Sequence, residues 1–172
     1  MKYSPFEIDK ALQSMRIIAD TREQDTAAFR RRFAACGLQV ERRKLDFGDY
    51  TAVTTIGNDE ICLAEKVVVE RKMGLVELCM CFGKERARFQ REFQRAASSG
   101  AKTYLLVENA TWENILAGKY RSKLHPNALK AAIWAWTARY NIVPVFCKAE
   151  ISGSIIADIL HYELRAYLEG AE

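Results

Sequence analysis

A run of three valines that ends in three charged residues, "VVVERK" (67–72), constrains the fold of this chain more than any other segment. Consecutive β-branched residues favour the interior of a strand, and charges at its end must reach water or one another. Upstream, "DYTAVTTI" (49–56) has the same strand character, and the intervening "GNDE" (57–60) is a turn signal. The pattern predicts an antiparallel hairpin with strands at 49–56 and 61–71.

The register of this hairpin decides which charged residues meet at its open end. Opposed residues in an antiparallel ladder have position numbers with a constant sum, and a turn centred after Asp59 gives a sum of 119. That register places Asp49 opposite Glu70, with Cβ atoms about 4.5–5.5 Å apart. Strand alternation puts Glu70 and Lys72 on one face and Arg71 on the other. The hairpin therefore predicts two carboxylates and one ammonium at one end of a sheet.

Two carboxylates held this close repel each other unless a cation lies between them. The arrangement suits a divalent metal ion that keeps several waters and accepts a phosphate oxygen, which is the behaviour of magnesium. The alternative is a solvated strand end, where Glu70 and Lys72 form only a weak surface ion pair. An acid and a base two residues apart are common, so this spacing alone does not separate the two interpretations.

Helix and strand patterns alternate along the rest of the chain. Helical patterns occupy 5–15, 24–36, 73–80, 82–98, 111–117, 126–140 and 152–168, and further strand patterns occupy 16–20, 38–45, 103–109 and 142–147. This order predicts an α/β fold with a mixed central sheet that contains the hairpin and carries helices on both faces. No repeat or Pro/Ser-rich linker divides the sequence, so we expect residues 1–172 to form a single domain.

Composition narrows the classes of function. A net charge of +4 and a pI near 8.8 permit a polyanionic partner without requiring one. Five cysteines without CxxC spacing, beside only two histidines, argue for reduced thiols rather than a thiolate zinc site. No apolar run approaches the roughly 20 residues that cross a bilayer, and the N-terminus has no signal-peptide core. We expect a soluble cytoplasmic or otherwise intracellular protein, nucleoid or nucleus included, with no membrane association and no nucleotide cofactor.

Three segments, "ADTRE", "LDFGDY" and "VVVERKMGLVEL", in that order and spacing, resemble the XPF/Mus-type and archaeal Hef structure-specific nucleases. The likeness continues through "RARFQREFQRA" and "TYLLVE" to the closing helices, so it covers nearly the whole chain. The resemblance implies a restriction-endonuclease-like core with a catalytic β-hairpin. It also implies an endonuclease of DNA repair or recombination, which hydrolyses phosphodiester bonds in branched, flap or fork DNA with Mg²⁺ or Mn²⁺.

The same resemblance assigns roles to the residues of the hairpin. Asp49 and Glu70 become the main metal ligands, with the Val69 carbonyl as a third. Lys72 becomes the group that orients or activates the attacking water, or neutralises charge that builds on the phosphoryl oxygens. Arg71 becomes a brace of the site or a phosphate contact.

Other expectations from the resemblance lie outside the hairpin. Asp20 and Glu23 become an outer acidic pair that holds water or a second metal ion, with Asp20 as the ligand. Family members commonly pair through their nuclease domains, so we expect a homodimer. The helix-hairpin-helix module that often follows this domain has no counterpart within residues 1–172.

One position departs from the family pattern. The last aspartate of that pattern falls on Val76, whose side chain can neither accept a hydrogen bond nor bind a metal ion. The adjacent Glu77 points about 100° away on a helix and is a doubtful substitute. The departure leaves open a catalytically weakened or inactive DNA-binding member of the same fold. A third interpretation is a restriction- or repair-type nuclease that cuts ordinary duplex.

Two basic segments are candidate DNA contacts. On the helix predicted at 82–98, apolar side chains share one narrow face, namely Phe82, Phe89, Phe93 and Ala96. Basic side chains take the opposite face, namely Lys84, Arg88, Arg91 and Arg95. A polar loop before the helix at 126–140 adds Lys119, Arg121 and Lys123. An ordinary solvated helix face and a flexible surface loop are the alternatives. Such phosphate contacts position DNA without reading its sequence.

Overall fold

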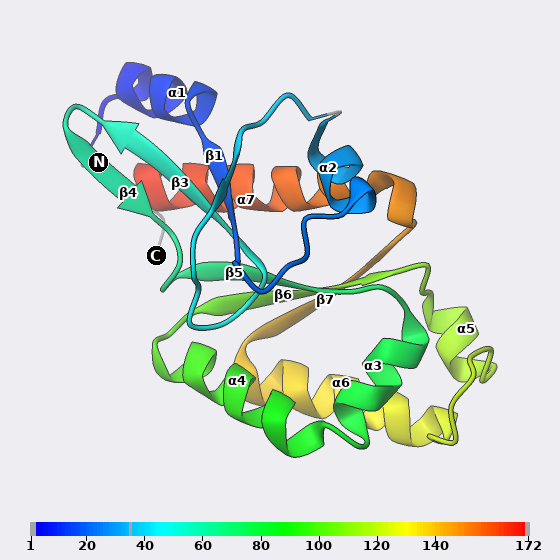
Figure 1. Cartoon of the computed structure of the whole chain (residues 1–172). Coiled ribbons are helices and arrows are strands. Elements are labelled where there is room, and N and C mark those ends of the chain that lie inside the picture. The colour runs from blue at the N-terminus through cyan, green and yellow to red at the C-terminus, as the bar shows by residue number, and fades with distance from the viewer. Residues whose placement is uncertain (1–2, 35, 171–172) are drawn as a thin grey trace.

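The structure, a computed structural model, describes residues 3–34 and 36–170. A mixed sheet runs through the middle of the molecule, with helices above and below it (Figure 1). The elements are α1 (Pro5–Gln13), β1 (Arg16–Ala19), α2 (Ala27–Ala34), β2 (Val40–Arg42), β3 (Tyr50–Ile56), β4 (Asp59–Cys62), β5 (Val67–Lys72), α3 (Leu75–Phe82), α4 (Arg86–Ser98), β6 (Lys102–Glu108), α5 (Trp112–Leu116), α6 (Pro126–Tyr140), β7 (Ile142–Cys147), the 3-10 helix η1 (Ala149–Ile151) and α7 (Ser152–Glu169).

Within the described residues, the strands form one sheet in the order β2-β1-β3-β5-β6-β7, and β4 pairs with β3 alone. β3 runs antiparallel to β1, β4 and β5, whereas β5, β6 and β7 are parallel to one another. Parallel neighbours need crossover connections, and the helices α3, α4 and α6 supply them. The predicted mixed sheet is confirmed.

Each face of the sheet carries its own apolar core. Side chains of β6 alternate, so Leu106 packs toward α1, α2 and α7, while Leu105 packs toward α3, α4 and α6. The first core is centred on Ile17 and Val69, and the second holds the fully buried Trp136. The predicted helices on both faces are therefore confirmed. No helix of the described residues is long and apolar enough to span a bilayer.

The predicted hairpin is interrupted. Its turn lies at Gly57 and the next residue, so that Ile56 opposes Asp59 and the position sum is 115. β4 then ends at Cys62, and the chain turns again through 63–66, where the Leu63 carbonyl accepts from two backbone N–H groups. Those four residues change the register, because β5 rejoins β3 with a sum of 119. The predicted turn centre and continuous strand 61–71 were wrong, but the register at the site end is the predicted one.

The boundary between the two helices after the hairpin also differs from its prediction. α3 extends to Phe82 and is closed by Gly83, whose N–H donates to the Met80 carbonyl. α4 begins only at Arg86, so Phe82 and Lys84 do not lie on it. Phe82 is buried at the end of α3, and Lys84 is exposed in the turn between the helices.

Candidate active site

The open end of the hairpin brings the predicted site residues together. Asp49 directly precedes β3, and its N–H donates to the Val69 carbonyl at 2.9 Å. The Asp49 carboxylate in turn accepts the backbone N–H of Arg71 at 2.8 Å. Asp49, Glu70, Arg71 and Lys72 all line one cleft of about 460 Å³. The end of the hairpin thus contributes two acids and two bases to the cleft, on backbone that the sheet fixes.

Glu70 and Lys72 form a buried ion pair rather than a solvated one. Lys72 Nζ lies 2.5 Å from Glu70 Oε1, and the two residues are 6% and 4% exposed. The ammonium also lies 4.4 Å from the centre of the Phe89 ring. Burial lowers the pKa of Lys72, but the charges of Glu70 and Asp49 outweigh it, so the pKa is raised and Lys72 stays charged. A surface pair at a frayed strand end is excluded.

Burial and neighbouring carboxylates destabilise the charged forms of both acids of the site. Burial raises the pKa of Asp49 well above its ordinary value, and the charge of Glu70 raises it further. Burial also raises the pKa of Glu70, although Lys72 opposes this. The charge of the Lys72 ammonium does not bring the pKa of either acid back to its ordinary value. A further cation in the cleft would therefore stabilise the two carboxylates.

The donor set decides which cation fits. Among residues 3–34 and 36–170, no three His, Cys, Asp or Glu side chains converge into a metal site. Two carboxylates and the Val69 carbonyl remain, and that carbonyl already accepts one hydrogen bond. Mg²⁺ uses one or two carboxylates and keeps several waters, so the residues present fit a hydrated hard cation.

Arg71 is braced from the next strand. Its guanidinium donates two hydrogen bonds of 2.7 Å to the carboxylate of Glu108, which is 3% exposed. Arg32 Nε approaches the same carboxylate at 3.6 Å. Burial raises the pKa of Glu108, but the bonds from Arg71 and Ser152 and the two arginine charges outweigh it, so the pKa is lowered. Of the two roles predicted for Arg71, this geometry favours the brace over a phosphate contact.

Of the predicted outer acidic pair, only Glu23 lines the cleft. Asp20 is fully buried, and its oxygens accept hydrogen bonds from Arg22 at 2.7 Å and from the Leu45 N–H at 2.6 Å. Asp20 does not line the cleft, whereas Glu23 does and accepts the Tyr50 hydroxyl at 2.6 Å. The metal-binding role of Asp20 stays a prediction, and its hydrogen bonds give it a local role in shaping the loop after β1.

Glu77 reaches the site from α3, contrary to the direction expected for it. Its Oε1 lies 3.7 Å from Lys72 Nζ, and its Oε2 accepts the Met73 N–H at 2.8 Å. Side chains on a helix lean toward its N-terminus, which returns Glu77 to the strand end. Val76 is 45% exposed and does not line the cleft.

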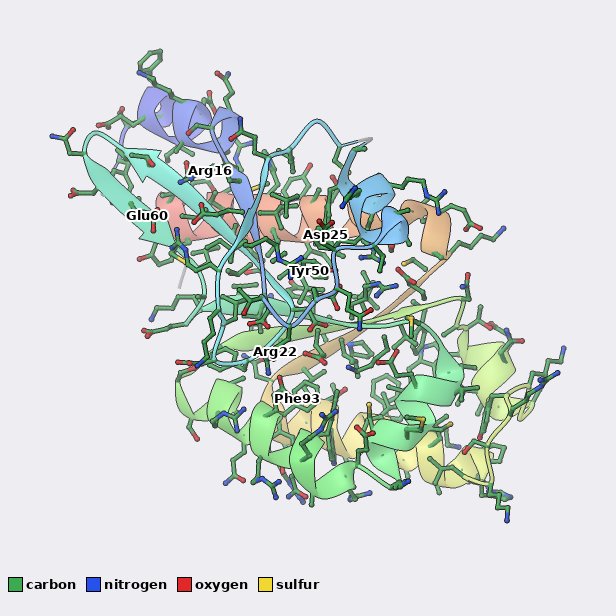
Figure 2. All side chains as sticks on the ribbon, viewed as in Figure 1. Arg16, Arg22, Asp25, Tyr50, Glu60 and Phe93 are labelled. Carbon is green, nitrogen blue, oxygen red and sulfur yellow. The ribbon has the colours of Figure 1, made fainter. Side chains whose placement is uncertain are left out.

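Two more charged residues of the cleft carried no signal in the sequence. Glu92 of α4 lines the cleft, and its Oε1 lies 3.9 Å from the guanidinium of Arg22. Figure 2 places Arg22 and Tyr50 near the middle of the molecule, between the two helix layers. Arg22 and Glu92 come from elements 70 positions apart, so only the tertiary fold brings them together.

The predicted DNA-contact residues are all exposed. On α4, Phe89, Phe93 and Ala96 are buried and the predicted basic face points outward with Arg88, Arg91 and Arg95. Arg88 also lines the cleft. The loop between α5 and α6 presents Lys119, Arg121 and Lys123. Contact of these residues with DNA stays a prediction.

Comparison with known proteins gives a family profile and two solved structures. The ERCC4 domain profile matches residues 19–157. XPF from Aeropyrum pernix matches with a TM-score of 0.63 and 19% identity over 86% of this chain and 61% of that chain. The same protein in complex with DNA matches with a TM-score of 0.62 and 20% identity over 86% of this chain and 64% of that chain. This chain therefore spans less than two thirds of either one. No curated protein sequence matches.

Proposed function

The chain belongs to the ERCC4 domain family, and from that membership we propose that it is a metal-dependent DNA endonuclease acting on branched, flap or fork structures. The observation that carries the proposal is the cleft in which Asp49, Glu70 and Lys72 converge. The pKa of each of the two acids is raised there. The similarity in fold to an XPF that was solved with DNA supports DNA as the substrate.

The residues of the cleft divide the work of hydrolysis. Asp49 and Glu70 would hold Mg²⁺ or Mn²⁺, and the Arg71 N–H orients the Asp49 carboxylate. A divalent ion bound there supplies positive charge to the phosphodiester and activates water for attack. Lys72 places its fixed charge where negative charge builds on the phosphoryl oxygens. As the water oxygen bonds to phosphorus it gives up a proton to solvent, while the bond to the leaving sugar oxygen breaks and that oxygen takes up a proton from solvent.

Labelled flap, fork, Holliday and linear substrates, incubated with Mg²⁺ or Mn²⁺, test the proposal. We expect the wild type to cut branched substrates in preference to linear duplex. Asp49→Ala and Glu70→Ala each lower the rate by roughly a thousandfold or more. Cutting that survives both substitutions would contradict the assignment of the site. Equal cutting of linear duplex would instead favour a restriction- or repair-type nuclease.

Val76 supports a second candidate, a DNA-binding member of the family that has lost activity. On that account the wild type binds branched DNA without cutting it, and Val76→Asp restores cutting. Val76→Asn is the matched control, because it changes size and polarity similarly without adding a carboxylate. The other acids and Lys72 are in place, which favours the active enzyme.

We also propose that the chain forms a homodimer through an apolar face made by α5, α6 and β7. Trp134, 52% exposed, stacks on Trp112 at 4.9 Å, and Phe146 packs edge-on against Trp112 at 5.1 Å. Leu116 of α5 is 55% exposed. Exposed apolar patches of this kind mark interaction sites. Light scattering should show a dimer that Trp134→Glu converts to a monomer. A wild-type monomer at all concentrations would contradict the proposal.

A further inference from the structure

The ammonium of Lys72 is enclosed by three groups. Glu70 lies 2.5 Å away, Glu77 lies 3.7 Å away, and the Phe89 ring centre lies 4.4 Å away. Lys72 is only 6% exposed, so water does little to compensate its charge. A buried ammonium without a carboxylate partner is strongly destabilising.

Glu70 cannot serve Lys72 alone if the proposed function holds, because the same carboxylate is proposed to bind a divalent cation. An oxygen that a cation shares is a weaker partner for the ammonium, since the two positive charges repel. Asp49, whose charge also acts on Lys72, is proposed to bind the same cation, so Lys72 then depends on Glu77 as the remaining acid within reach. We propose that Glu77 is a positioning residue that holds the Lys72 ammonium in the cleft. The catalytic part of this inference rests on the proposed function.

The backbone fixes the Glu77 carboxylate for this task. Oε2 accepts the Met73 N–H at 2.8 Å, just before α3 begins, and this leaves Oε1 directed at Lys72. The side chain is 33% exposed, against 8% for that of Lys72, so the pair lies at the wall of the cleft rather than on the open surface. The neighbouring Val76 is 45% exposed and does not line the cleft, whereas Glu77 does, so Glu77 is the side chain of this turn of α3 that faces the site.

A double-mutant thermodynamic cycle on the metal-free protein tests the contact between Glu77 and Lys72 without an activity assay. Glu77→Gln keeps an oxygen that accepts the Met73 N–H but removes the charge that faces Lys72. We expect it to lower the Tm in the wild-type background and to have a smaller effect in the Lys72→Met background. An equal shift in both backgrounds would overturn the inference, because the loss would then come from the helix terminus alone.

Cutting kinetics test the consequence. Glu77→Gln should lower kcat about tenfold, equivalent to about 1.4 kcal/mol, and leave KM within about twofold. Glu77→Asp, which keeps the charge, should retain more activity than Glu77→Gln. The control is Glu60→Gln, which removes an acid paired with Arg43 at 2.7 Å outside the cleft and should change neither constant. Unchanged kcat in Glu77→Gln, or an equal loss in Glu77→Asp, would overturn the positioning role.

The two kinds of failure are distinguishable. A wild type that cuts no substrate contradicts the proposed function, while the thermodynamic cycle still decides whether Glu77 holds Lys72. A wild type that cuts, with a Glu77→Gln variant that cuts equally well, contradicts only the role of Glu77.

Discussion

The acids of the site are held in a state that costs stability. Asp49 is partly buried and next to Glu70, and both burial and that neighbouring charge raise its pKa. An acid whose pKa is higher in the folded protein destabilises that protein once both states are ionised. The charge conflict is therefore a property of the metal-free molecule, and a cation bound between the two acids would relieve it.

Asp49→Asn should raise the Tm of the metal-free protein while abolishing cutting. Its amide oxygen can still accept the Arg71 N–H, and the repulsion from Glu70 is gone. At pH 7 we expect a gain of about 2–4 °C, the shift that about 1 kcal/mol produces in a domain of this size. The gain should vanish as the pH falls below the ordinary value of 3.8, where the unfolded chain is protonated too. Thermal melts of this variant beside Asp59→Asn, a control at the exposed start of β4, check the prediction, and a loss of Tm at pH 7 would contradict it.

Glu108 acts in the opposite sense, because its arginine partners stabilise the charged form. Glu108→Gln should lower the free energy of unfolding by about 2–4 kcal/mol at pH 7, since it leaves Arg71 with a weakened buried partner. The pKa of Glu108 is lowered in the folded protein, so its contribution is present above the ordinary value of 4.5 and is lost as the pH falls through the folded pKa.

The pH dependence provides the check on Glu108. Denaturation at several pH values should show wild type and Glu108→Gln converging as the pH falls below the ordinary value of 4.5. Glu163→Gln is the control, since that acid pairs with the more exposed Lys102 at 2.6 Å. A difference that stays constant down to pH 3 would mean that the ion pair is not the source of the stability.

At the level of residues, strand alternation alone brings Glu70 and Lys72 to one face of β5. The position of Asp49 opposite Glu70 has the predicted sum of 119, but the predicted turn behind that sum was wrong, and the interruption at 63–66 restores the register. Glu108 and Arg32 were missed as partners of Arg71 because their contact depends on which strand follows β5 and which helix covers it. The direction of the Glu77 side chain was predicted wrongly. The prediction used the 100° between successive helical residues but not the position where α3 starts, which decides which side chain faces the site.

Among the elements, the hairpin depends on a close approach at its open end. Gly48 has a φ of +72°, and a Cβ on it would lie 2.7 Å from the Cβ of Val68. The residue directly precedes Asp49, so any shift of this backbone moves a carboxylate of the site.

Gly48→Ala should lower the free energy of unfolding by about 2–4 kcal/mol and reduce cutting, through backbone strain and the clash together. Gly57→Ala is a matched control, since its φ of +61° carries a similar strain but nothing lies within 4 Å of the added Cβ. We expect it to cost only about 1 kcal/mol and to leave cutting unchanged. Denaturant titrations compare the two, and equal losses would show that the contact with Val68 is unimportant.

The order and type of the elements followed from sequence periodicity, but the breaks within them did not. The segment 61–71 has no Gly or Pro to mark its interruption, and buried Leu63 turns the chain there by accepting two backbone N–H groups. Gly83 is a visible stop signal, yet the apolar Cys81 and Phe82 before it fitted either helix. Packing against the second core assigns both of them to α3.

On the scale of the whole molecule, the exposed basic face of α4 and one wall of the cleft belong to the same helix. α4 exposes Arg91 and Arg95 outside the cleft, while Arg88 and Glu92 of the same helix line it. A phosphate backbone that enters the cleft would pass this basic face. The DNA-contact role of α4 stays a prediction, which the next experiment tests.

Arg91→Ala should weaken DNA binding in proportion to one lost phosphate contact. The slope of log K against log salt should fall in magnitude by about 0.9, with no change in preference between sequences. Arg165→Ala removes the same charge from α7, in the other helix layer, and should leave the slope unchanged. Fluorescence anisotropy at several salt concentrations measures the slope for each variant. A slope for Arg91→Ala identical to that of the wild type would show that Arg91 of α4 does not contact DNA.

The central claim is that Asp49 and Glu70 together hold a divalent metal ion at the end of the hairpin. A crystal soaked in Mn²⁺ and measured at the manganese absorption edge tests it most directly. We predict one anomalous peak within about 2.0–2.4 Å of an oxygen from each carboxylate, and no such peak in an Asp49→Ala crystal. A peak bound elsewhere, or none between these two acids at saturating Mn²⁺, would contradict the account.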